Sequence, residues 1–291
     1  PSPLILRDVV AALEALWPPS HAAEWDRVGL VTGDLGQPVR RILLALDPTL
    51  AVIGEARAWE ADLLVTHHPL LLRGVHSVAT STAKGASVTA LVSAGIALLV
   101  AHTNADVAEP GVSTVIADAL GLTAQRPLSQ LGAHPAGRVG ELPHPETLTA
   151  FADRVVQALP ATAGGVRVSG DPAGEVSTVA VMGGSGDDLF DAVWASGADV
   201  YVTADLRHHP VLEAREEARD GTPYVIDAGH WAMESLWLET ARRQLLEALG
   251  EDPSPSAAPT RVEARVSGLR TEPWTFVAGA NRARPHTGGV S

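Results

Sequence analysis

Short runs of apolar residues alternate along this chain with longer segments in which apolar residues recur every three or four positions. The short runs are apolar throughout, which is typical of strands buried on both faces of a parallel sheet, and the periodic segments predict covering helices. Strands are predicted at 41–46, 61–66, 96–101, 166–169, 178–182, 198–203, 224–227 and 262–266. Helices are predicted at 4–17, 50–59, 83–93, 112–120, 146–159, 187–195, 206–219 and 229–249. This alternation predicts the α/β class with mostly parallel sheets.

Four segments follow neither pattern. Segment 25–30 is predicted to be turn-rich, and segment 125–145, which is rich in Pro and Gly, is predicted to connect two domains. Segment 251–260 has the composition of a flexible loop, and the end of the chain from residue 278 is predicted to be disordered.

An internal repeat divides the chain. Segment 61–66 (ADLLVT) matches segment 198–203 (ADVYVT), and each follows an apolar strand and a helix at the same distance. Each also leads to a His-His-Pro sequence, which begins at His67 and at His208. A match of strand, helix, strand and motif predicts two related α/β domains. We place the first at 1–125 plus 222–291 and the second at 126–221.

Composition narrows the class of protein. The chain has 291 residues, a formal net charge of −13 and no cysteine, so disulfides and thiolate metal sites are excluded. An acidic surface disfavours binding to nucleic acid. No apolar run reaches the length of a membrane span and no leader of the exported type is present, so we expect a cytoplasmic protein without a membrane partner.

Histidines and a carboxylate follow two of the predicted core strands. His67 and His68 follow strand 61–66, and His102 and Asp106 follow strand 96–101. Ligands of open α/β sheets bind outside the carboxyl ends of the strands, so these side chains are candidates for one metal site. If the chain turns after residue 66, both adjacent rings can serve a pair of ions about 3.5–4 Å apart. The alternatives are a hydrogen-bonded core histidine beside a surface one, and an aspartate that caps a helix.

A second candidate pair lies on helix 229–249. His230 and Glu234 are four residues apart and share one helical face, which continues through Leu238 and Ala241. A carboxylate in this apolar stripe costs several kcal/mol unless it is paired, and a metal ion removes that cost. The spacing alone also occurs by chance. Nitrogen and oxygen ligands suit Zn, Fe, Mn, Co or Ni, and five protein ligands for two ions require one bridging carboxylate.

The remaining candidates have weaker signals. His208 and His209 belong to the second copy of the repeat, where they either begin a helix as exposed rings or face the pocket with Asp205. His102 is interpreted as a partner of a ligand or of the substrate rather than as a sixth ligand. The glycine-rich segment 183–186 either forms a turn or lets helix amides hold a phosphate.

Five motifs occur in order along nearly the whole chain, and together they resemble the signature of the Nif-three-like dinuclear-metal family, commonly labelled GTP cyclohydrolase 1 type 2 homologues. The motifs are Trp25-Asp26-x-x-Gly29-Leu30, Thr66-His67-His68-Pro69, His102-Thr103-Asn104-x-Asp106, Thr203-x-Asp205-x-x-His208-His209 and Asp227-Ala228-Gly229-His230-x-x-x-Glu234. The resemblance implies two α/β domains with the metal site between them at the strand ends. It also implies two divalent ions per subunit and a homohexamer built as a trimer of dimers.

The resemblance further implies a set of ligands: His67, His68, Asp106, His230 and Glu234, with Asp106 or Glu234 bridging. Two positions depart from the family pattern, which usually has Asn in place of Arg27 and Gly in place of Ala204. Neither is a ligand. Ala204 is expected to narrow the side of the pocket formed by the second domain.

Two functions agree with these residues. The first is a metal-dependent hydrolase that acts through a metal-activated water on a nucleotide or another small anionic molecule, as the GTP cyclohydrolase label suggests. In this interpretation His102 or His208 shuttles the proton, and Asp205 and His209 contact the substrate. The alternative is a non-catalytic hexameric scaffold, metal chaperone or regulator, so the sequence leaves open whether the protein is an enzyme.

Overall fold

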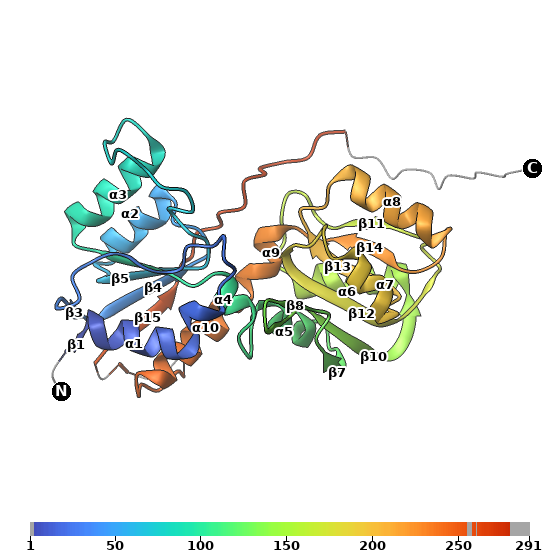
Figure 1. Cartoon of the computed structure of the whole chain (residues 1–291), viewed down its shortest axis with the longest axis horizontal. Coiled ribbons are helices and arrows are strands. Elements are labelled where there is room, and N and C mark those ends of the chain that lie inside the picture. The colour runs from blue at the N-terminus through green and yellow to red at the C-terminus, as the bar shows by residue number, and fades with distance from the viewer. Residues whose placement is uncertain (1–2, 255–257, 260, 280–291) are drawn as a thin grey trace, which may run out of the picture.

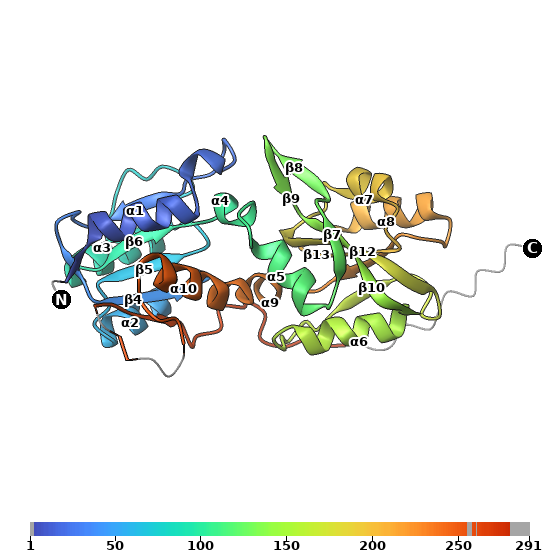
Figure 2. The ribbon, with the colours of Figure 1, turned by 90° about the horizontal axis from the view of Figure 1, so that it is seen from below.

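The computed structural model describes residues 3–254, 258–259 and 261–279, which form two lobes, each built on one large β-sheet (Figure 1, Figure 2). The predicted α/β class is confirmed. The loop predicted at 251–260 and the disorder predicted from 278 fall in part on residues 255–257, 260 and 280–291, which lie outside the described residues. Among the described helices, none combines the length and the apolar content that a membrane span needs.

The first lobe is a largely parallel sheet between two layers of helices. In spatial order its strands are β15 (Glu263–Val266), β4 (Arg41–Ala45), β5 (Leu63–Thr66), β6 (Ala97–Val100) and the antiparallel edge strand β2 (Gly29–Thr32). The covering helices are α1 (Leu6–Leu16), α2 (Leu50–Ala58), α3 (Ala83–Ala94) and α10 (Trp237–Ala248). Leu44 and Val65 pack in one core with α1 and α10, whereas Leu43 and Leu64 pack in another with α2 and α3. Burial on both faces explains why these strands are apolar at every position.

The sheet of the second lobe is mixed. In spatial order its strands are β11 (Arg167–Ser169), β14 (Tyr224–Asp227), β13 (Val200–Ala204), β12 (Glu175–Ser185), β10 (Arg138–Thr147) and β7 (Thr123–Arg126). Only β12, β13 and β14 are mutually parallel, so the prediction of mostly parallel sheets holds for the first lobe and not for the second. Its helices are α5 (Val112–Ala119), α6 (Leu148–Ala158), α7 (Phe190–Ser196) and α8 (His208–Ala218).

Segment 125–145, predicted to be a connection, instead contributes to β7 and β10 and forms the hairpin of β8 (Ser129–Leu131) and β9 (His134–Ala136). Its prolines and glycines are compatible with strands for local reasons. Pro143 and Pro145 lie where the register with β12 shifts, between Glu141 and Glu146, so they interrupt no regular ladder. Gly140 lies so close to Leu122 that a Cβ atom would come within 2.9 Å of that side chain. The prediction was wrong because these contacts are not local in sequence.

Several short elements were not predicted from the sequence. They are β2, the pair β1 (Leu4–Ile5) and β3 (Pro38–Val39), the 3-10 helix η1 (Pro19–His21) and the single-turn helix α4 (Thr103–Asp106). Each is too short to carry a periodic signal.

The internal repeat has a structural counterpart. In the first lobe, Oδ2 of Asp62 accepts hydrogen bonds from the backbone N–H groups of residues 40 and 41, where β4 begins. In the second lobe, Oδ2 of Asp199 accepts the equivalent pair from residues 177 and 178 in β12. The repeated aspartate therefore ties neighbouring parallel strands together in both lobes.

The predicted helix 229–249 consists of α9 (His230–Ser235) and α10, which are separated by Leu236. Helix α9 contacts β12 and β13 of the second lobe, while α10 packs on the first lobe, so one continuous core joins the two sheets. The division at 125/126 and 221/222 stays a prediction. By strand pairing alone, β14 belongs to the second sheet although it follows residue 222.

Candidate metal centre

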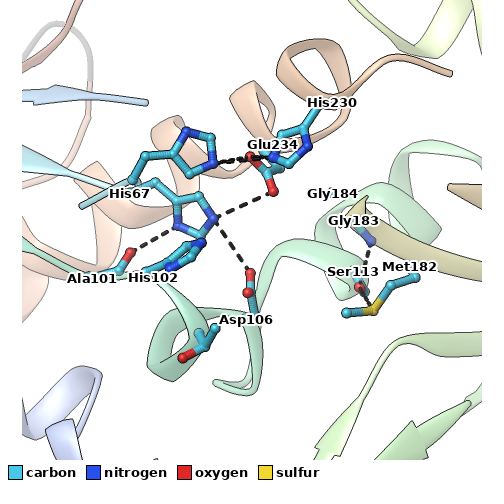
Figure 3. A network of polar contacts seen from close by, with 12 residues as sticks. His67, Ala101, His102, Asp106, Ser113, Met182, Gly183, Gly184, His230 and Glu234 are labelled. Carbon is cyan, nitrogen blue, oxygen red and sulfur yellow. Dashed lines mark hydrogen bonds and ion pairs between the residues drawn. The ribbon is translucent and has the colours of Figure 1, made fainter. Parts of the chain in front are cut away.

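Side chains from three separated segments converge where α9 meets the first lobe (Figure 3). His67 and His68 follow β5, Asp106 ends α4, and His230 and Glu234 lie one turn apart on α9. After Thr66 the chain turns, and the Thr66 hydroxyl donates a hydrogen bond to the His68 carbonyl. Both histidine rings then face Glu234. The five residues named from the sequence as metal ligands are therefore neighbours in the fold.

The donor atoms form two groups that share Glu234. Nε2 of His67 lies 3.6 Å from Oδ1 of Asp106 and 3.7 Å from Oε1 of Glu234. The other carboxylate oxygen, Oε2, lies 2.8 Å from Nε2 of His68 and 3.0 Å from Nε2 of His230, and these two nitrogens are 3.2 Å apart. We call the His67–Asp106 side the first position and the His68–His230 side the second position.

Each of the three histidines is oriented through its other ring nitrogen. Nδ1 of His67 lies 2.9 Å from the carbonyl oxygen of Ala101, and Nδ1 of His68 lies 2.7 Å from Oδ1 of Asp47. Nδ1 of His230 lies 2.7 Å from Oδ2 of Asp205. Carbonyl and carboxylate oxygens only accept, so each Nδ1 carries a proton and each Nε2 is the atom that faces the centre, where a cation can take the place of its proton. This is the usual arrangement around metal-binding histidines.

His102 joins the site from the side of His67 and His68. Its ring lies edge-on to theirs, with centroids 5.1 Å and 5.5 Å away. Its Nδ1 lies 3.0 Å from Oδ1 of the buried Asp26, and Oδ2 of that carboxylate accepts from both the N–H and the hydroxyl of Thr103. Burial would raise the pKa of Asp26, but the hydrogen bonds from His102 and Thr103 outweigh it and hold the pKa well below its usual range. Asp26 is thus a charged anchor for the His102 ring.

The carboxylates of the centre stabilise positive charge on the neighbouring histidine rings. Burial alone would lower the pKa of His68, but the neighbouring carboxylates of Asp47 and Glu234 raise it to about 9. For His230 burial again acts downward, and Asp205 and Glu234 raise the pKa to about 10. Burial would raise the pKa of Glu234, yet the surrounding histidines, His67 foremost, hold it well below its usual value.

The residues present fit a bound metal ion. Nε2 of His67 and Oε2 of Glu234 are buried without a hydrogen bond of good geometry, and a cation would satisfy both. Metal–ligand distances of about 2.0–2.2 Å separate neighbouring ligand atoms by roughly 3–3.5 Å. The donor atoms of the second group have about this spacing, and in the first group Nε2 of His67 lies 3.6 Å and 3.7 Å from its two carboxylate neighbours. Sets of donor atoms able to share one ion include His67, His68 and His102, and also His68, His230 and Glu234.

The structure places the remaining candidate residues outside the group of five candidate ligands. Asp205 lies against Nδ1 of His230. His208 and His209 begin α8 as exposed rings that contact each other, and His208 lines a separate pocket. Ala204, expected to narrow the pocket, is instead buried in the core. No finding assigns a role to Asp205, His208 or His209 in chemistry, so those roles stay predictions.

The glycine-rich segment serves packing rather than a helix start. Gly183 and Gly184 lie inside β12, and α7 begins only at Phe190. A Cβ at Gly183 would come within 2.5 Å of Val112, and one at Gly184 would come within 2.4 Å of Oε1 of Glu234. The phosphate-binding interpretation therefore loses its structural basis.

Two carboxylates of the site were missed in the sequence. Asp47 lies two residues after the end of strand β4, at the same sheet edge as His67 and His68, so the position rule that found the histidines also applies to it. Asp26 was noticed only as part of a motif, since its partners His102 and Thr103 are more than 70 positions away.

Comparisons with known proteins show which proteins this chain resembles. The sequence profile of the family described as Duf34/NIF3 (NGG1p interacting factor 3) matches residues 4–257. A Streptomyces coelicolor protein named GTP cyclohydrolase 1 type 2 homolog is 49% identical over 278 residues, which cover 93% of each chain. The fold is similar to that of a Bacillus cereus protein related to NIF3, with a TM-score of 0.83, 25% identity, and coverage of 95% of this chain and 100% of that one. It is also similar to reduced HcgD from Methanocaldococcus jannaschii, with a TM-score of 0.71, 27% identity, and coverage of 86% and 97%. The match to the family profile runs through both lobes.

Proposed function

The chain belongs to the Duf34/NIF3 family, and on this premise we propose that it holds two divalent ions and hydrolyses a nucleotide or another small anionic molecule. The observation that carries the proposal is the division of Glu234 between two groups of donor atoms. A single carboxylate that faces one imidazole with Oε1 and two with Oε2 is the arrangement expected of a bridging ligand. Glu234, rather than Asp106, is therefore proposed as the bridge.

Each position has its own ligands under this proposal. His67, Asp106 and Oε1 of Glu234 would hold one ion at the first position, and His68, His230 and Oε2 of Glu234 would hold the other at the second. Zn, Fe, Mn, Co and Ni all suit such a nitrogen and oxygen set. When bound, two divalent ions would attract an anionic substrate and lower the pKa of a coordinated water toward neutrality.

The chain's own residues supply positioning and proton transfer. His102 is held by Asp26 at Nδ1, so its Nε2 is free to take a proton from the reacting water and return it to the leaving group. The His67 side chain is fully buried, whereas those of His68 and His230 are 20% and 29% exposed. We infer that substrate approaches the second position. A contact of Asp205 or His209 with the substrate, and proton transfer by His208, remain secondary proposals.

The His67 side chain is fully buried, so a substrate would have little access to the first position. This burial favours the alternative, a metal-binding scaffold or chaperone without turnover. The two functions are separated by incubating the metal-loaded full chain with a panel of nucleotides and phosphoesters and measuring the release of formate and phosphate. Turnover that disappears in His102→Ala while the metal content stays at two ions supports the hydrolase. Full metal content without turnover on any substrate would favour the scaffold. We propose a homohexamer in the cytoplasm as the setting of either function.

Asp47→Asn is expected to weaken metal binding at the second position by about 10- to 100-fold, the usual effect of removing an outer partner of a metal ligand. Asparagine can still accept a hydrogen bond from Nδ1 of His68, but it lacks the negative charge that makes Nε2 a stronger donor. The affinity is measured by competition with a chromophoric chelator. Asp153→Asn, which changes an exposed aspartate on α6, is the control, and equal affinities in the two variants would contradict a role for Asp47.

A further inference from the structure

A pocket separate from the metal centre lies in the second lobe. It is formed between α8 and the edge strand β11, with β14 as its floor. Its volume is about 370 Å³, within the usual range of small-molecule sites. None of the five candidate metal ligands lines it. It lies beside the carboxyl ends of β13 and β14, the edge at which α/β sheets bind ligands, as the metal centre lies at the carboxyl ends of β5 and β6.

One part of this pocket is apolar. Val168 of β11 and Leu212 of α8 are 45% and 47% exposed, and Val211 and Val225 join them in the lining. Exposed aliphatic side chains that face each other across a hollow favour a flat apolar group between them.

The other part is cationic. Arg167, Arg207, Arg215 and His208 line the pocket, in a chain whose net charge is −13. Arg215 is committed to the fold, because it donates to the carbonyl groups of residues 221 and 223. The other two guanidinium groups are more available.

Arg167 and Arg207 each use one nitrogen for a carboxylate, Asp227 and Asp187 respectively. Asp227 has its hydrogen-bond partners within the fold, because it also accepts the backbone N–H of Leu206. An arginine has five N–H donors in a planar fork, so each keeps donors for a second anion. The acidic residue in the lining is therefore neutralised, and the arginines remain able to bind a ligand.

We propose that this pocket binds an organic anion, with the charged group on Arg167 and Arg207 and an aromatic or other flat apolar part between Val168 and Leu212. Phosphate, sulfonate and carboxylate groups all match the guanidinium fork. The site is independent of the metal centre and gives a role to the second His-His-Pro sequence, whose first histidine lines it. It goes beyond the proposed hydrolysis, because binding here needs no metal ion.

The test uses the full chain after chelator treatment, with 8-anilinonaphthalene-1-sulfonate as a fluorescent aromatic anion. We expect one saturable site from which phenyl phosphate displaces the probe. Phenol and inorganic phosphate should displace it at least about tenfold less well, because phenol lacks the charged group and inorganic phosphate lacks the apolar part. Equal displacement by phenol would overturn the anionic part of the proposal. Equal displacement by inorganic phosphate would overturn the apolar part.

Leu212→Glu places a negative charge in the pocket and is expected to weaken binding of the probe by about tenfold or more. The matched control is Val156→Glu, which makes the same kind of change at a position on α6 that is 54% exposed and outside the pocket. In the double variant Arg167→Gln/Arg207→Gln, phenyl phosphate should lose its advantage over phenol. Unchanged binding in both pocket variants would refute the site. Before chelator treatment, both variants should have the metal content of the unmodified chain.

Discussion

Glu234→Ala is expected to remove both metal ions from the protein at once. The two oxygens of this carboxylate face different groups of imidazoles, so its loss takes a ligand from both positions. We expect the affinity at each position to fall by more than about 100-fold, beyond the effect of losing an outer partner. Metal content is measured by plasma emission spectrometry after gel filtration and should drop from two ions per chain to nearly none.

The design includes two comparisons. Glu247→Ala removes an exposed glutamate from the neighbouring helix α10 and should leave both ions in place. His67→Ala removes a ligand from the first position alone and should leave one ion. If Glu234→Ala retained one ion, as His67→Ala should, the carboxylate would not bridge.

The candidate ligands were predictable because they obey a rule of position. His67, His68 and Asp106 follow parallel strands at their carboxyl ends, and the strands are recognisable from sequence because both of their faces are buried. The structure brings these three residues together with the pair on α9. Whether they hold metal remains the proposal above.

The residues that orient the ligands were not predictable in the same way. The role of Asp47 depends on the rotation of the His68 ring, and that of Asp26 depends on a contact with His102 across 76 positions of sequence. A pattern of apolar and polar positions carries no information on ring rotation. Segment 125–145 shows the same limit, because its strands are determined by pairing with β12 and not by their own composition.

Gly184 illustrates how the second lobe contributes to the centre without providing a ligand. It lies in β12 with a φ of +73°, and its missing side chain leaves room for Oε1 of Glu234. From the sequence it belonged to a glycine-rich turn with a phosphate-binding alternative. The structure instead makes it the wall against which the proposed bridging carboxylate rests.

Gly184→Ala is therefore expected to reduce metal binding sharply while the protein still folds. The new Cβ would lie 2.4 Å from Oε1 of Glu234 and 3.4 Å from Cε1 of His230, so the end of the glutamate side chain must move. Moving a flexible side chain costs little energy, but it withdraws the carboxylate from both positions. We expect metal content below one ion per chain, measured by emission spectrometry, and a thermal transition that is still cooperative but lies at a lower temperature than that of the unmodified chain.

Gly197→Ala separates this effect from backbone strain. Gly197 has the same φ of +73°, and a Cβ there would meet no atom within 4 Å. Both substitutions put an alanine in the left-handed region, which costs about 1–2 kcal/mol, so both variants should lose similar stability in thermal unfolding of the metal-free chain. Only Gly184→Ala should lose metal. Equal metal content in the two variants would show that Glu234 can withdraw without consequence, and the bridging role proposed for it would then have to be abandoned.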